Sequence, residues 1–228
     1  MLPAFVLILL FIILLFPQFW VQKVIKKYSE PIKTLPGTGG ELAQHLVKRF
    51  KLDGVSIKKV ENGNDHYNPE TKTIALSESN YNEKSLAAVT IAAHEFGHAL
   101  QHKTNYKPLL LRTNLAKFAA IAEKVASVIL IASPFAFILA KIPAVGLIML
   151  LAGFTIMCLP VILHIITLPV EFDASFNRAL PILSEGEYLS SSTMPIAKKI
   201  LTAAALTYVS ASLSSLLNFY RWFLILRR

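Results

Sequence analysis

Four long apolar blocks alternate with polar segments along the chain. They cover Leu2–Val21, Phe118–Ala140, Ala144–Leu168 and Ile200–Leu217. Each has roughly the 20 residues that an α-helix needs to cross about 30 Å of hydrocarbon. The pattern therefore predicts a mainly α membrane protein, in which transmembrane helices carry a small α+β domain.

The first block predicts a transmembrane anchor over residues 1–22. A secretory signal peptide would have a basic start, a shorter apolar stretch and a small-residue cleavage site. No basic residue precedes this run, and bulky aromatic residues end it. Three lysines follow at once, at Lys23, Lys26 and Lys27. Because basic residues favour the cytoplasmic side, we expect this end of the anchor to face the cytoplasm.

The second and third blocks predict a transmembrane helical hairpin over residues 118–168. A tight turn at Lys141–Pro143 separates the two blocks. The alternative is a pair of buried helices in a soluble core. The scarcity of polar residues in either run favours the membrane.

The last segment, residues 200–228, has two possible placements. Its apolar block is rich in Ala, Ser and Thr, which suits close helix packing in lipid. If the block crosses the membrane, Arg221, Arg227 and Arg228 emerge on the outer side, against the positive-inside rule. The sequence leaves open whether this helix is transmembrane or interfacial.

Residues 23–117 form the predicted catalytic domain on the cytoplasmic side. Turn residues punctuate it, and short runs show helical or strand periodicity. The expected elements are a helix over Glu41–Phe50 with Thr38 as N-cap, strands at Val55–Val60 and Thr71–Leu76, a loop over Ser77–Asn82, and a helix starting near Asn82 or Ser85.

The last of these helices contains the pattern HExxH, with His94, Glu95 and His98 in the three defining positions. A helix places residues i and i+4 on one face, so both imidazoles can reach one ion. Zinc accepts imidazole nitrogen and keeps a position for water in catalytic sites. Glu95 would take the proton from that water as it attacks a carbonyl. The motif predicts a zinc-dependent hydrolase.

A third metal ligand is expected elsewhere in the chain. The candidates are Glu171, Asp173, His102, His164 and His66. Glu171 is favoured because it follows Pro169, a residue that often starts a helix, where the third apolar block returns to the aqueous side. Two crossings separate it from the motif, so Glu171 and His94 are expected on the same side of the membrane. Residues 169–199 are thus predicted to be a third-ligand helix and loop.

The composition of the chain limits the classes of protein to which it can belong. The chain has 228 residues, a net charge of +9 and 54% hydrophobic residues. A soluble domain of this size rarely contains so much apolar sequence. Nucleic-acid binding is disfavoured because the basic residues flank apolar blocks instead of forming one patch. The single cysteine, Cys158, excludes an intramolecular disulfide. Oligomeric state is not readable.

Several segments together resemble the YugP-like neutral zinc metallopeptidases. The matching segments are His66–Pro69, Ser85–Val89, His94–Gln101, Leu168–Ser175, Asn177–Leu180 and Thr202–Val209. The resemblance covers nearly the whole chain, and it extends more distantly to the HtpX-type and CAAX-prenyl proteases. It implies a membrane gluzincin with a zincin-like domain and one Zn²⁺, whose third ligand maps onto Glu171.

The resemblance also suggests residues around the metal. The distant relatives often carry an Asp four residues after the third ligand, whereas this sequence has Ser175 there and Asp173 two residues on. Asp173 is a possible orienting group or a carboxylate at a helix start. Arg178 could stabilise the oxyanion, form a plain salt bridge or contact a lipid headgroup. Tyr208 is a further oxyanion candidate.

The function expected from the sequence is hydrolysis of peptide bonds in membrane or membrane-proximal proteins by a zinc-activated water. The partners are then a polypeptide substrate and the lipid bilayer, with the protein in the cell membrane as a multi-pass chain. The alternative is a non-catalytic metal-binding scaffold or chaperone. A transporter would need polar residues along the spans, and few are present.

Overall fold

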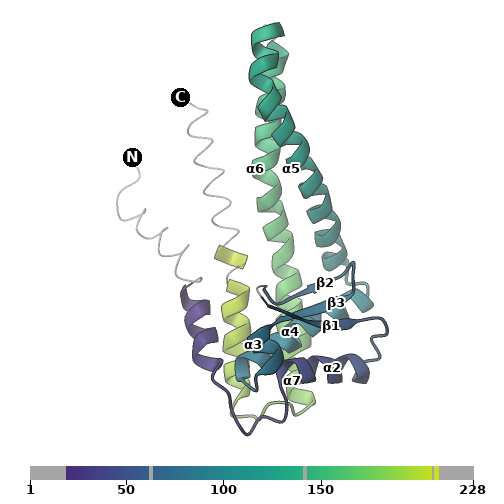
Figure 1. Ribbon diagram of the computed structural model, residues 1–228, viewed down its shortest axis with the longest axis vertical. Helices are drawn as coiled ribbons and strands as arrows, with labels where there is room; N and C mark the ends of the chain where they lie inside the picture. Colours follow the sequence, from purple (N-terminus) through teal and green to yellow (C-terminus); the bar gives the residue numbers. More distant parts are fainter. Residues whose placement is uncertain (1–18, 62–63, 141–142, 207, 211–228) are drawn as a thin grey trace.

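The computed structural model describes residues 19–61, 64–140, 143–206 and 208–210. Most of the predicted anchor, residues 1–18, and the end of the last block, residues 211–228, lie outside these ranges. Residues 19–28 and 194–206 are helical, and both helices extend on the same side of the small domain as a long helical hairpin (Figure 1). The described residues are mostly helical, with one three-stranded sheet.

The sheet has the strand order β1-β3-β2. β1 (Ser56–Val60) pairs in parallel with β3 (Thr73–Ser77), and β2 (His66–Asn68) pairs antiparallel with β3. The two expected strands are present, but they do not form a hairpin with each other. The hairpin partner of β3 is β2, which was missed because three residues are too few to show an alternating pattern.

A hydrophobic core joins the sheet to two helices. α2 (Gly39–Arg49) and α4 (Leu86–Lys103) both pack into it. Phe96 and Ile74, from α4 and β3, are fully buried. α4 is enclosed nearly all round, which fixes the position of the HExxH motif within the domain.

The expected loop over Ser77–Asn82 is wrong, because a short helix, α3 (Glu78–Asn82), occupies it. The Asp65 carboxylate accepts hydrogen bonds at 2.7 Å from the backbone N–H of Ser77 and from the Asn80 side chain. A helix of five residues has no detectable periodicity, so a long-range contact decides this segment.

α5 (Lys107–Ala140) and α6 (Pro143–Phe172) form a long antiparallel hairpin that rises from the small domain (Figure 1). The two helices of the predicted transmembrane hairpin are present, although the expected turn residues 141–142 lie outside the described ranges. α5 begins 11 residues before the predicted span, so the boundary expected at residue 118 falls inside one continuous helix.

Large apolar side chains on this hairpin face outward. Ile131 is 73% exposed and Phe135 is 67% exposed. In the described part of the chain, one helical stretch, Leu159–Glu185, has the length and composition needed to cross a membrane. A crossing by α5, and with it the multi-pass arrangement, stays a prediction.

The expectation that Pro169 starts a new helix is wrong. α6 continues through both Pro160 and Pro169 to Phe172. The π-helix η1 (Asp173–Ala179) follows directly, and then α7 (Leu180–Glu185). An internal proline removes one backbone hydrogen bond, and long apolar helices tolerate this where a local π-helical adjustment satisfies the freed groups.

The N-cap of α2 offers a test of this fold. The Thr38 hydroxyl accepts from the Glu41 N–H at 3.1 Å, and the Glu41 carboxylate accepts from the Thr38 N–H at 2.8 Å. Thr38→Ala should lower the free energy of unfolding by about 1 kcal/mol. Thr38→Ser keeps the hydroxyl and should retain most of the stability. Denaturant titration of both variants measures the difference; equal losses would contradict the capping role.

Candidate metal centre

The centre is built on α4, whose start the sequence defines well. Ser85 is the N-cap, and its hydroxyl accepts from the Ala88 N–H at 3.1 Å. An Ala-rich sequence then continues the helix without interruption. His94 and His98 lie one turn apart, and their rings meet edge to face with centroids 4.7 Å apart.

Glu171 reaches these rings from the last turn of α6. Its Oε2 lies 3.2 Å from His94 Nε2 and 3.4 Å from His98 Nε2. The carboxylate is 2% exposed, and its Oε2 has no hydrogen-bond partner within the part of the chain that the structure describes. The structure thus brings together the three side chains that the sequence singled out, with one ligand atom of each within 4.8 Å of the others.

Gly97 allows α4 to approach η1 closely. A Cβ at this position would lie 2.7 Å from the Ala174 carbonyl oxygen, closer than real Cβ contacts. Any other residue would push the two helices apart. Because Glu171 lies three residues before Ala174, this backbone contact sets the distance between the carboxylate and the imidazoles.

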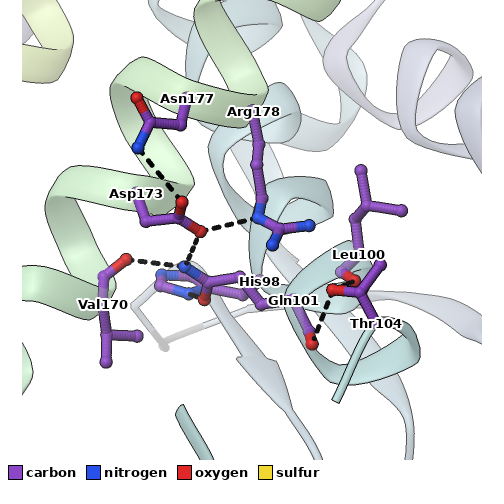
Figure 2. A network of polar contacts seen from close by, with 8 residues as sticks. All are labelled: His98, Leu100, Gln101, Thr104, Val170, Asp173, Asn177 and Arg178. Carbon is purple, nitrogen blue, oxygen red and sulfur yellow. Dashed lines mark hydrogen bonds and ion pairs between the residues drawn. The ribbon is translucent and has the colours of Figure 1, made fainter. Parts of the chain in front are cut away.

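Gln101 fixes the proton position on His98. Its amide nitrogen donates at 2.8 Å to the Val170 carbonyl oxygen and at 2.8 Å to Asp173 Oδ2 (Figure 2). Both partners only accept, so the amide oxygen must face His98 Nδ1, 2.9 Å away. Nδ1 therefore carries the proton in the neutral ring, and the Nε2 lone pair points at Glu171.

This arrangement fits a divalent cation. An unprotonated imidazole nitrogen facing a carboxylate oxygen is repulsive unless a positive charge lies between them. Zinc at about 2.0–2.2 Å from each ligand in tetrahedral geometry implies ligand separations of about 3.3 Å. The observed distances of 3.2 and 3.4 Å from the Glu171 oxygen to the two imidazole nitrogens match this separation. Two imidazoles with one carboxylate are also a donor set that zinc accepts.

Ser175 and Gln101 are the orienting residues to which the sequence reasoning gave no role. The Ser175 hydroxyl lies 3.1 Å from His94 Nδ1 and is fully buried. Ser175 therefore bonds to the Nδ1 atom of His94, as Gln101 does to the Nδ1 atom of His98. The available signals were the spacing of Gln101, three residues after His98, and the position of Ser175, four residues after Glu171.

Asp173 and Arg178 lie behind the centre. Arg178 Nε donates to Asp173 Oδ2 at 2.6 Å (Figure 2). The Arg178 guanidinium also lies over the Tyr106 ring. Asp173 contacts Gln101 and not an imidazole. Of the three roles considered for Arg178, the geometry matches the salt bridge. Asp173 is connected to His98 only through the Gln101 amide.

Glu95 is 6% exposed, and its carboxyl group bonds to the backbone of Tyr67 in β2. Burial raises its pKa to about 7. His94 and a hydrogen bond from the Tyr67 backbone oppose the rise in pKa, while Glu171 and Asp65 add to it. A carboxyl group with a pKa near neutrality can both accept and return a proton.

Tyr208, from the helix after residue 194, also reaches the centre through a side-chain hydrogen bond with Glu171. The remaining histidines do not join the cluster. His66 is exposed in β2, with Nδ1 2.8 Å from the Asn64 carbonyl, and His102 Nδ1 lies 2.8 Å from the Tyr67 hydroxyl. His164 stays on α6, outside the ligand group.

Comparison with known proteins agrees with this geometry. A family model described as "Putative neutral zinc metallopeptidase" matches residues 4–227. The chain belongs to this family. It is also similar to the "Putative membrane protease YugP" of Bacillus subtilis (strain 168), with 34% identity over 209 residues, 91% of this chain and 89% of that protein. No solved structure matches the chain.

Family membership makes zinc content the natural measurement for the helix contact. Gly97→Ala should separate α4 from η1 and lower zinc affinity at least tenfold, because the backbone carbonyl of Ala174 cannot yield. Gly153→Ala on α6 is the control, since nothing lies within 4 Å of a Cβ there. Zinc is measured by competition with a fluorescent chelator. Unchanged affinity in Gly97→Ala would contradict the account of the close approach.

Gln101→Met tests the orientation of His98. The substitution keeps the length of the side chain but removes the amide, so zinc affinity should fall roughly 10- to 100-fold. Gln44→Met is the matched control, because Gln44 is exposed and bonds only to the Tyr81 hydroxyl. Equal zinc affinity in the two variants would show that the Gln101 amide does not orient the His98 ring.

Proposed function

We propose that this chain is a membrane-embedded zinc-dependent endopeptidase that cleaves membrane or membrane-proximal proteins. One observation carries the proposal. His94, His98 and Glu171 converge from helices α4 and α6, with the Glu95 carboxyl buried beside them. The family description and the name of the Bacillus relative point to the same class.

Each residue of the centre has a distinct proposed role. His94 and His98, through Nε2, and Glu171 would hold one zinc ion. When bound, zinc supplies Lewis acidity that polarises the peptide carbonyl and acidifies water. Glu95 accepts the proton of the attacking water and delivers it to the leaving amine.

Three further residues support these groups. Gln101 and Ser175 keep the ring nitrogens Nδ1 of His98 and His94 occupied, so that each Nε2 stays available. Tyr208 bonds to Glu171 and is the candidate for stabilising the oxyanion, because its hydroxyl lies among the reacting groups. Asp173 and Arg178 act as one ion pair that holds the Gln101 amide.

The edge of the sheet offers a place for an extended substrate. The expected strand Thr71–Leu76 corresponds to β3, which lies between β1 and β2 and has no free edge. β1 and β2 are the edge strands, and the Tyr67 backbone of β2 reaches Glu95. A peptide that adds to β2 would pass over the catalytic carboxyl.

We place the enzyme in the cell membrane as a multi-pass protein with its centre on the cytoplasmic side. The lysines after the first apolar block support this side. The antiparallel α5–α6 hairpin returns Glu171 to the level of α4. Lipid and a polypeptide are therefore the proposed partners.

A non-catalytic metal-binding scaffold or chaperone is the alternative function. Its centre would hold the ion in the same way but would make no use of Glu95. The glutamate, and not the metal ligands, therefore separates the two functions.

Glu95→Gln should retain zinc and lose proteolysis by at least about 100-fold, because the amide cannot accept the proton. Zinc content and casein cleavage are measured on the purified full chain in detergent. Glu61→Gln, an exposed site, is the control for the loss of one carboxylate. Equal, chelator-insensitive cleavage by wild type and Glu95→Gln would refute the mechanism, and zinc binding without any cleavage by wild type would favour the scaffold.

A further inference from the structure

A cavity lies along α4, beyond the metal centre. Its volume is about 390 Å³, and it opens between the end of α4, the loop from α2 to β1 and the turn from β2 to β3. Its charged and polar lining comes from Lys51, Asp53, Lys72, His102, Lys103 and Asn105. Tyr67 and Ala99 complete the wall facing the sheet and helix.

The charge of this cavity is strongly positive. Lys51, Lys72 and Lys103 line it against one acid, Asp53. The nearby Glu70 carboxylate is already paired with Lys117 at 2.7 Å. Lys103 donates to the Phe50 and Lys51 carbonyl oxygens, which fixes its ammonium group at the rim without neutralising it. Neither Lys51 nor Lys72 forms an ion pair with any carboxylate among the described residues.

The loops that carry these charges contain residues in the left-handed backbone region. Lys51, Lys72 and Asn105 have positive φ angles of 50°, 50° and 51°, and among the described non-glycine residues only Glu187 shares this feature. Lys51 and Asn105 are the left-handed residues that end α2 and α4, a common helix ending, whereas Lys72 lies in the turn between β2 and β3. Each conformation fixes the direction in which the loop leaves the cavity rim.

The cavity is aligned with the catalytic carboxyl. Ala99 and His102 follow Glu95 by four and seven residues, on the same face of α4. Seven residues correspond to about 10 Å along the helix. Tyr67 connects the two places, since its backbone reaches Glu95 while its hydroxyl meets His102 in the cavity wall at 2.8 Å.

We propose that this cavity binds a carboxylate of the polypeptide substrate, about three residues from the scissile bond. The spacing follows from about 10 Å divided by about 3.3 Å per residue of an extended chain. Lys51 and Lys72 supply the charge, and the neutral Tyr67 hydroxyl can donate a hydrogen bond. This inference rests on the proposed function, and it adds a preference for acidic sequences to it.

The test uses one neutral peptide with a fluorophore and a quencher. Asp or its neutral match Asn is placed singly at each position within four residues of the scissile bond. With the full wild-type chain in nanodiscs, Asp about three residues away on one side should raise kcat/KM roughly five- to tenfold over Asn. Peptides that end there as a free acid or an amide distinguish a terminal carboxylate from a side-chain carboxylate.

The double variant Lys51→Gln and Lys72→Gln should lose the preference for Asp, so that kcat/KM becomes equal for the Asp and Asn peptides. Lys58→Gln with Lys198→Gln removes the same charge from exposed positions outside the cavity and should keep the preference. Loss of the preference in both double variants, or its survival in the first, overturns the proposal.

Two arms separate this proposal from its alternatives. Inhibition of Asn-peptide cleavage by inorganic phosphate but not by chloride at equal ionic strength, with no Asp preference, would reassign the cavity to a phosphate or a lipid headgroup. Binding of labelled peptides to Glu95→Gln, followed by fluorescence polarisation, needs no turnover. Tighter binding of the Asp peptide supports the cavity even if wild type cleaves nothing, whereas cleavage of all peptides without preference overturns the cavity and leaves the peptidase intact.

Discussion

The hydrogen bonds of the Gln101 amide are the constraint on which the centre depends. One end holds His98, and the other holds the Val170 carbonyl and Asp173. The same side chain therefore orients an imidazole on α4 and attaches that helix to the end of α6. A buried amide with all its groups satisfied is rigid, and a partly satisfied one would be costly. Ligand orientation and helix packing are thus a single property of this molecule.

The π-helix η1 is the second constraint. A π-helix aligns residues five apart, and Asp173 and Arg178 pair across that interval. Ser175, also in η1, faces His94. Glu171, four residues earlier and in the last turn of α6, faces both imidazoles. An ordinary α-helix would rotate these side chains relative to one another. The junction of α6 and η1 therefore supplies a metal ligand, an orienting hydroxyl and an ion pair that point in three directions.

The sequence predicted the parts of the site that local spacing encodes. His94, Glu95 and His98 follow from the HExxH pattern on a predicted helix. Glu171 is favoured among five candidates by its place after Pro169 at the end of the third apolar block, and the two crossings between it and the motif agree with that choice. Gln101 was not predicted, because its role depends on Val170, a contact across 69 residues. The same holds for α3, which is ordered by Asp65, and for the parallel pairing of β1 with β3.

The prolines show a second reason why the sequence does not predict every helix boundary. The sequence predicts a helix start at Pro169, since proline is common at the first position of helices. In the structure α6 runs through it, because the apolar surroundings and the adjacent π-helix compensate for the lost hydrogen bond. A rule learned from helix ends in water does not transfer to a helix with this environment.

The distance along the chain between the two halves of the centre has a consequence for biosynthesis. Gln101 and Asp173 are 72 residues apart, and the whole α5–α6 hairpin lies between them. During translation the first half leaves the ribosome long before the second exists. The newly made chain therefore has no complete ligand set until the hairpin has been synthesised and has folded back.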